Sequence, residues 1–181
     1  MHRRQFTGAL LAAPWLAQAQ PDALDARLRA GACVVLFRHA QTDPGIGDPP
    51  GFRMDRCSTQ RNLSAEGRAQ AERIGQWFKL RGLEPSAVKS SAWCRCKDTA
   101  DLAFGRHRVW PALNSFFGEY RTRDAQTAQL RAALKGMPAG EFEVWVTHQV
   151  NMTALTGEGM AMGEALVLDV TGTVLARNTF V

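Results

Sequence analysis

The sequence Val34-Val35-Leu36-Phe37-Arg38-His39-Ala40-Gln41-Thr42 joins an apolar run to a pair of basic side chains. A short apolar run bounded by turn-forming residues is typical of a buried β-strand. Residues 43–51 are almost all Asp, Pro and Gly, and they predict a loop. Arg38 and His39 are therefore expected at the carboxyl end of a strand, which is where open α/β sheets bind their ligands.

Helix and strand patterns alternate on both sides of this stretch. We expect helices over 21–30, 65–81, 92–104, 122–134 and 149–155, and strands over 33–39, 87–91, 142–147, 165–170 and 173–177. This order predicts an α/β fold, a three-layer sandwich whose mostly parallel central sheet is flanked by helices and ends in a C-terminal hairpin. A long loop over 40–62 follows the first strand, and loops of that length are usually functional or disordered.

The first residues have the pattern of an export signal. Arg3 and Arg4 precede an apolar run over 8–16, and Ala17-Gln18-Ala19 fits a small-x-small cleavage site. The run is too short to span a bilayer. Because the arginine pair is followed by Phe6, the pattern resembles a twin-arginine signal, with a Sec signal as the alternative. We expect an export signal over 1–19, one domain over 20–181 and a periplasmic location.

Composition narrows the classes of partner. The chain has 22 Lys and Arg against 17 Asp and Glu, a formal net charge of +5, and two of the arginines fall in the expected signal. The remaining domain is mildly basic and has no basic stripe interleaved with aromatic residues, so we do not expect a nucleic-acid partner. We expect a small anionic substrate and no stable membrane insertion, and the sequence leaves the oligomeric state open.

Four cysteines permit disulfides in an oxidising compartment. Cys33 opens the apolar strand and is expected to be a buried thiol. Cys94 and Cys96 are two residues apart on an expected helix, so their side chains point in different directions, and we expect one of them to pair with Cys57. Sequence alone does not choose among the three full connectivities. A zinc site is disfavoured, because the Cys-x-Cys pair with a distant third cysteine lacks the usual ligand spacing.

Polar side chains follow three of the expected strands. The first strand ends in Arg38 and His39, the second ends in 90–91 and leads into Arg95, and the last strongly apolar strand ends in His148. If these strands are parallel neighbours, two arginines and two histidines meet at one edge of the sheet. Arginines can neutralise phosphoryl oxygens, and a neutral imidazole can act as a nucleophile. The sequence therefore predicts a phosphoryl-transfer site.

The same residues fall in four blocks that resemble the histidine phosphatase superfamily, the phosphoglycerate mutase-like group. Residues 36–42 are similar to its Arg-His-Gly-x-Thr signature, and residues 61–71, 90–100 and 146–148 are similar to the blocks that follow, in the family's order. Two positions depart from the pattern. Ala40 replaces the signature glycine, and Gln149 stands where phytase-like acid phosphatases have Asp; the chain is also too short for their cap domain.

The resemblance implies an exported phosphatase, a phosphoric monoester hydrolase in which His39 is the nucleophile that becomes phosphohistidine. Arg38, Arg95 and His148 would bind the phosphoryl group, Thr42 would add a hydroxyl, and water would then hydrolyse the phosphohistidine. The resemblance implies no metal and no other cofactor, because the arginines supply the positive charge that Mg²⁺ supplies elsewhere. The implied partner is a small phosphorylated substrate.

Several points stay open in the sequence. Glu119 is the first candidate for the proton donor, because it follows a segment similar to the acid-bearing region of the mutase-like branch; Asp55 and Asp124 are the alternatives. Arg61 suits a substrate contact or a structural salt bridge equally well. Because Ala40 departs from the family and the acid is not settled, the alternative function is a phosphate-pocket binding module with weak or no catalysis.

Overall fold

Strand β1 (Cys33–Arg38) lies inside a six-stranded sheet with the order β3-β2-β4-β1-β5-β6. The computed structural model describes residues 23–180, so the expected signal over 1–19 lies outside the described residues. β1 is parallel to β4 (Phe142–Thr147), and β4 is parallel to β2 (Ala87–Ser90), which is parallel to β3 (Arg108–Val109). Strands β5 (Ala165–Asp169) and β6 (Val174–Asn178) are antiparallel and form the predicted hairpin.

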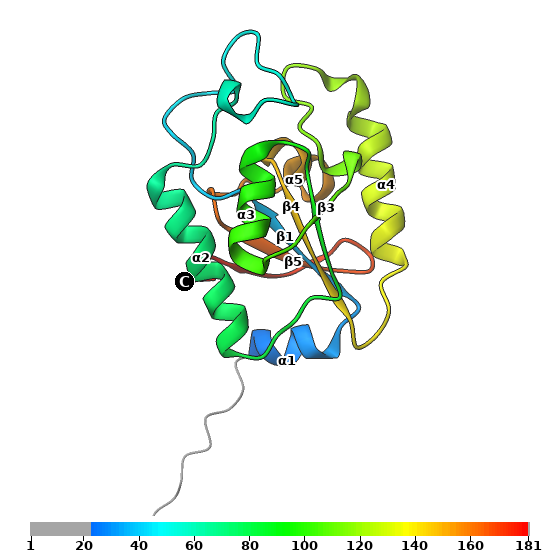
Figure 1. Ribbon diagram of the computed structural model, residues 1–181. Coiled ribbons are helices and arrows are strands. Elements are labelled where there is room, and N and C mark those ends of the chain that lie inside the picture. The colour runs from blue at the N-terminus through cyan, green and yellow to red at the C-terminus, as the bar shows by residue number, and fades with distance from the viewer. Residues whose placement is uncertain (1–22, 181) are drawn as a thin grey trace, which may run out of the picture.

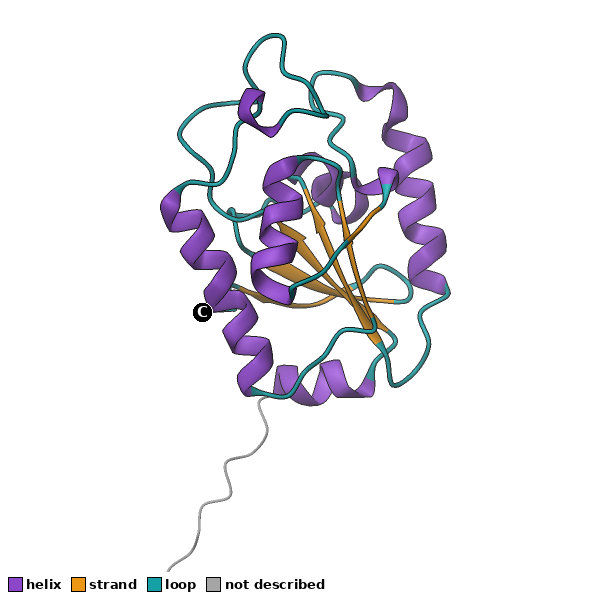
Figure 2. Cartoon of the chain, in the orientation of Figure 1, coloured by secondary structure: helices purple, strands orange, loops and turns teal. Residues whose placement is uncertain are grey.

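Helices cover both faces of this sheet (Figures 1 and 2). Side chains alternate along β1, so Val35 and Phe37 pack in one hydrophobic cluster while Val34 and Leu36 pack in the other. The first cluster includes residues of α1 (Ala23–Ala30), α2 (Ala65–Leu80) and α3 (Cys94–Phe104), and the second includes residues of α4 (Arg123–Lys135) and α5 (Gln149–Thr156). The predicted three-layer sandwich with a mostly parallel sheet is confirmed.

The register of the sheet brings three strand ends together. Arg38 pairs with Thr147, and Ser90 pairs with Val146, so β1, β2 and β4 all end at the same edge. Above this edge lie the loop over 40–62, with the short 3₁₀ helix Cys57–Thr59, and the segment that carries the 3₁₀ helices Pro111–Leu113 and Tyr120–Thr122 (Figure 1). The edge is therefore covered by loops and not by a further helical layer.

The start of α2 is fixed by its cap and by a close backbone approach. The side-chain oxygen of Ser64 accepts a hydrogen bond from the backbone N–H of Gly67 at 3.0 Å, as expected for an N-cap. A Cβ on Gly67 would lie 1.8 Å from the carbonyl oxygen of Gln41, so this position has room only for glycine. The second sequence block therefore packs directly against the end of the first.

None of the helices within 23–180 is long and apolar enough to cross a membrane.

Candidate active site

His39 follows β1 at the edge where the three strands end. Its Nδ1 lies 2.9 Å from the carbonyl oxygen of Ala40. Because a carbonyl oxygen only accepts hydrogen bonds, Nδ1 carries the proton and Nε2 of the neutral ring keeps its lone pair. Burial, together with the charge of Arg95, lowers the pKa of His39 to about 3. The ring is therefore neutral at physiological pH and presents an unprotonated nitrogen.

His148 follows β4 and faces His39, with 5.5 Å between the two ring centroids. Its Nε2 lies 2.8 Å from the hydroxyl of Ser91, which in turn donates to the side-chain oxygen of Asn114 at 3.3 Å. Nε2 is therefore the protonated nitrogen, and Nδ1 points to Nη2 of Arg95 at 3.5 Å. Burial and the charge of Arg95 hold the pKa of His148 well below its ordinary value.

Three arginines surround the two histidines. Nη1 of Arg38 donates to the carbonyl oxygen of Met160 at 2.6 Å, and Arg61 donates to the carbonyl oxygen of Gly45. The Nε atoms of Arg38, Arg61 and Arg95 are buried and have no hydrogen-bond partner in the described part of the chain. Burial and the neighbouring guanidinium groups lower the pKa values of Arg38 and Arg61. One buried and two half-buried guanidinium groups at one place form a receptor for an oxyanion.

These side chains line a single cavity of about 530 Å³. Its basic and imidazole groups are Arg38, His39, Arg61, Arg95 and His148, and its large apolar groups are Ile46, Phe52, Trp93 and Phe117. The ring of Phe52 lies 6.2 Å from that of Trp93, and Phe117 lies against the position a Cβ on Gly47 would take. The cavity thus combines a cationic set of groups with largely aromatic walls.

Arg95 lies in the first turn of α3 and is held by an acidic side chain from the long loop. Its Nη1 donates to one oxygen of Asp48 at 2.7 Å, and its Nη2 donates to the other at 3.3 Å. The indole N–H of Trp93 and the backbone N–H of Arg61 also donate to this carboxylate, at 2.9 and 3.0 Å. Asp48 is the only carboxylate among the described residues that line the cavity.

The loop over 40–62 is attached to the start of α3 by further bonds. Cys57 forms a disulfide with Cys94, which confirms the expected pairing, and the backbone N–H of Cys94 donates to the side chain of Gln60 at 2.9 Å. Cys33 and Cys96 are free and buried, as expected for Cys33. The sulfur of Cys96 lies 3.4 Å from Nε2 of His148, and burial raises its thiol pKa to about 12. Cys96 is therefore a neutral packing group beside the site.

Ala40 is accommodated without strain in the position of the family glycine. Among the described residues other than glycine, only Ala32 and Phe180 have positive φ, so Ala40 needs no left-handed conformation. Its N–H donates to the hydroxyl of Thr99 at 3.0 Å, and its carbonyl accepts from His39. Ala40 therefore makes both of these backbone contacts without a glycine at this position.

The structure places the other predicted site residues away from the cavity walls. Thr42 is buried, and its hydroxyl donates to the sulfur of Met162 at 3.6 Å. Glu119 pairs with Arg121 and lines a neighbouring cavity that shares Phe52, Trp93 and Phe117 with the site. The roles of Thr42 and Glu119 stay predictions.

The two alternative carboxylates are also engaged elsewhere. Asp55 is exposed and pairs with Arg53 at 2.7 Å, and Asp124 is exposed and pairs with Arg123 at 2.8 Å. Neither lines the 530 Å³ cavity. Within residues 23–180, no group of three or more His, Cys, Asp and Glu side chains is arranged to hold a metal ion.

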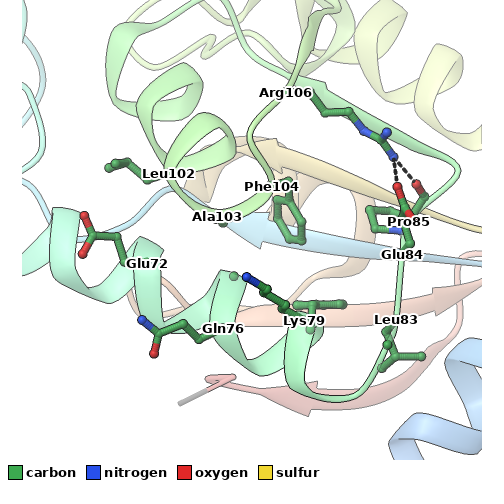
Figure 3. Close-up of a pocket in the computed structure, with 13 residues that line it drawn as sticks. Glu72, Gln76, Lys79, Leu83, Glu84, Pro85, Leu102, Ala103, Phe104 and Arg106 are labelled. Carbon is green, nitrogen blue, oxygen red and sulfur yellow. Dashed lines mark hydrogen bonds and ion pairs between the residues drawn. The ribbon is translucent and has the colours of Figure 1, made fainter.

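A second cavity, of about 620 Å³, lies between α2 and α3 (Figure 3). Arg106 reaches across its edge to Glu84 and to the carbonyl oxygen of Pro85. None of the predicted site residues lines this cavity, and no histidine is among its described lining residues. The phosphoryl chemistry predicted from the sequence therefore belongs to the cavity at the strand edge.

Sequence reasoning missed Asp48 and did not settle Arg61. Asp48 lies between Gly47 and Pro49 in a loop, and 47 positions separate it from Arg95. No local sequence pattern predicts an ion pair between residues so far apart in the chain. Arg61 does have a signal, because it opens the second sequence block. Arg61 makes no salt bridge within the described residues and lines the cavity, and its contact with a substrate stays a prediction.

Comparisons with known proteins agree with this geometry. The family model described as the histidine phosphatase superfamily, branch 1, matches residues 34–162. No curated protein matches the chain. Among solved structures, SixA from Agrobacterium tumefaciens, described as a candidate phosphohistidine phosphatase, has 25% identity and a TM-score of 0.53, and the match covers 76% of this chain and 91% of that one.

Two further solved structures share the fold. The protein histidine phosphatase SixA in complex with tungstate has 17% identity and a TM-score of 0.52, and the match covers 80% of this chain and 95% of that one. TTHB049 from Thermus thermophilus has 24% identity and a TM-score of 0.53, and the match covers 80% of this chain and 98% of that one. The likeness therefore extends over nearly the full length of each of these neighbours.

Proposed function

The chain belongs to branch 1 of the histidine phosphatase superfamily, and from this membership we propose that it hydrolyses phosphomonoesters through a phosphohistidine formed on His39. The family match and the SixA neighbours support phosphatase activity. The observation that carries the proposal is the state of His39. Its Nδ1 proton is tied to the carbonyl of Ala40, so Nε2 keeps its lone pair inside a cavity lined by three guanidinium groups.

The reaction takes place in two steps. In the first, Nε2 of His39 attacks phosphorus, the bond from phosphorus to the leaving oxygen breaks, and the leaving group departs as an alcohol once it has gained a proton. In the second, water attacks the phosphohistidine, Nε2 leaves with its electron pair, and inorganic phosphate is released. The guanidinium groups of Arg38, Arg61 and Arg95, which line the cavity, stabilise the negative charge on the phosphoryl oxygens in both steps.

The charge of the site suits a doubly ionised phosphoryl group. Arg38, Arg61 and Arg95 supply three positive charges and Asp48 supplies one negative charge, while His39 and His148 are neutral. The site is therefore doubly positive before substrate binds. A phosphomonoester close to neutral pH carries a charge of about −1.5 to −2.

The walls of the cavity favour an apolar or aromatic leaving group. Phe52, Trp93 and Phe117 line it, and Phe117 remains 57% exposed. An aryl phosphate is the matching model substrate, since its ring can pack against these side chains. The SixA neighbours described as phosphohistidine phosphatases make a phosphorylated imidazole the second substrate class, because that leaving group is also an aromatic ring.

Glu119 is the proposed proton donor for the leaving group. It stands in the cavity next to the site, and its present partner Arg121 is exposed, so breaking this pair costs about 1 kcal/mol or less. Glu119→Gln should slow substrates with poor leaving groups more than those with good ones, because only the former need a proton in the transition state. Equal losses on both, or none, would move the role to another group such as Asp55.

Export to the periplasm is proposed from residues 1–19. The disulfide between Cys57 and Cys94 supports this location, because disulfides persist in oxidising compartments. The mature protein in a periplasmic extract should begin close to Gln20. Full-length chain found only in the cytoplasm would overturn the proposal.

A panel of phosphomonoesters tests the activity, with His39→Ala as the control. The wild-type chain should hydrolyse an aryl phosphate and the variant should not. The alternative is a binding module that keeps the phosphate pocket without turnover. It is supported if the wild-type chain is inert on the whole panel and still binds phosphate.

A further inference from the structure

The two edges of the Arg95 guanidinium face different partners. A guanidinium has two edges that can each hold two oxygens, one between Nη1 and Nη2 and one between Nε and the nearer Nη. The Nη1–Nη2 edge of Arg95 is filled by the two oxygens of Asp48, at 2.7 and 3.3 Å. On the other edge, Nε is buried without a partner in the described chain, and Nη2 faces Nδ1 of His148 at 3.5 Å.

The second edge faces the histidines. Its Nη2 lies 3.5 Å from Nδ1 of His148, and the ring of His148 lies 5.5 Å from that of His39, centroid to centroid. All three side chains line the cavity, so an oxyanion there can approach the guanidinium while Asp48 keeps its hold on the opposite edge. Substrate binding does not require the ion pair to open.

We propose that Asp48 is the positioning residue of the phosphoryl site: its carboxylate clamps the Nη1–Nη2 edge of Arg95 and so fixes the orientation of the guanidinium in the cavity. The role rests on the proposed function for its substrate, since it assumes that an oxyanion occupies the cavity. Asp48 itself does not touch the reacting atoms; it acts through Arg95.

The surroundings of Asp48 suit a fixed clamp rather than a mobile gate. The two side chains of the pair are only 4% and 7% exposed, so water competes little for the bond. Beyond Arg95, the indole N–H of Trp93 and the backbone N–H of Arg61 hold the same carboxylate, which places two donors on each oxygen. The disulfide of Cys57 attaches the loop of Asp48 to α3 at the residue next to Arg95.

The protonation state of Asp48 agrees with this role. Burial by itself raises the pKa of a carboxyl group, but the hydrogen bonds and charge of Arg95 outweigh that effect, and the pKa of Asp48 is lowered. Asp48 is therefore an anion close to neutral pH, which makes it a lasting partner for the guanidinium and a poor proton donor to a leaving group.

Asp48 could instead occupy the place of the phosphoryl group, and this role predicts the opposite effect of Asp48→Asn on oxyanion affinity. If Asp48 occupied the place of the phosphoryl group, Asp48→Asn would free the site and raise its positive charge, so an oxyanion would bind more tightly. If Asp48 positions Arg95, the same change releases the guanidinium from its orientation, and the oxyanion binds more weakly despite the added charge. Calorimetric titration with tungstate, an oxyanion of phosphate-like shape, separates the two.

The experiment is a double-mutant cycle on the full domain with tungstate as the probe. We expect Asp48→Asn and Arg95→Lys each to weaken binding by about 10- to 100-fold, because small misplacements of a binding group have effects of this size. The double variant should be no weaker than Arg95→Lys, since the clamp has no function without the guanidinium fork. Additive losses, or tighter binding by Asp48→Asn, would overturn the proposal.

Two further variants serve as controls for this experiment. Asp43→Asn removes an exposed carboxylate from the same loop and should leave tungstate binding unchanged. Trp93→Phe removes one donor to Asp48 and should weaken tungstate binding by only a few-fold, so it tests the clamp even if Asp48→Asn fails to fold. If Asp48→Asn is unfolded and Trp93→Phe binds tungstate as the wild type does, the result counts against the clamp.

If the wild-type chain binds tungstate with the expected coupling but hydrolyses nothing, the proposed function fails and the clamp stands. If it binds no tungstate, the oxyanion site fails and the clamp with it.

Discussion

The neutral state of His39 predicts a defined loss of stability in mild acid. The pKa of His39 is lowered to about 3 in the fold, chiefly by burial, and that of an imidazole in an unfolded chain is about 6.5. Between these values the unfolded chain binds a proton that the native chain does not, so stability is full above pH 6.5 and falls as the pH falls towards 3. At pH 5 the loss from His39 alone is about 2 kcal/mol.

Urea unfolding at pH 8 and pH 5 measures this loss, with His39→Gln as the matched variant. Glutamine keeps a polar side chain but does not titrate, so the pH dependence of the wild type should exceed that of the variant by about 2 kcal/mol. His148 is present in both chains, and burial and Arg95, the largest causes of its lowered pKa, are retained in the variant. Equal pH dependence in the two chains would refute the reasoning, because it would mean that His39 already carries its proton in the fold at pH 5.

Three other predictions follow from single contacts. Gly67→Ala should destabilise the fold by about 3 kcal/mol, because its Cβ would meet the carbonyl of Gln41, whereas Gly159→Ala meets no described atom within 4 Å; thermal unfolding of both variants compares them. Reduction of the Cys57–Cys94 disulfide, which spans 37 positions, should lower the free energy of unfolding by about 3–4 kcal/mol, measured in urea with and without dithiothreitol. Arg61→Met should raise KM for an aryl phosphate about tenfold or more, since it removes a half-buried cation from the cavity, while Arg106→Met, in the other cavity, should not.

Much of the fold could be predicted because the signals are local. Each signal lies within a short stretch of sequence, and the structure has all three of the predicted features. They are strand β1, the helix cap at Ser64 and the hairpin of β5 and β6. Strand β3 was not predicted, because its two residues are exposed and pair only with the edge of β2. Two exposed residues carry no periodic pattern.

The site divides in the same way between local and distant contacts. Arg38, His39 and His148 could be predicted to lie together because they end or directly follow strands. Arg95 could be added because it lies in the first turn of the helix after β2, at the same edge of the sheet. The choice of Cys94 as the disulfide partner could not, since it depends on where α3 begins and on which side of it the loop passes. Asp48 was missed for the same reason, because its bond to Arg95 exists only once the long loop has folded over the strand edge.

The central claim is that a phosphoryl group passes through His39, and trapping it is the most direct measurement. The enzyme is mixed briefly with a labelled aryl phosphate, denatured, and digested under alkaline conditions that preserve phosphohistidine, and the label is located by mass spectrometry. Label is expected on His39 in the wild type and none in His39→Ala. Label retained by the variant, or found on another residue of the wild type, would contradict it.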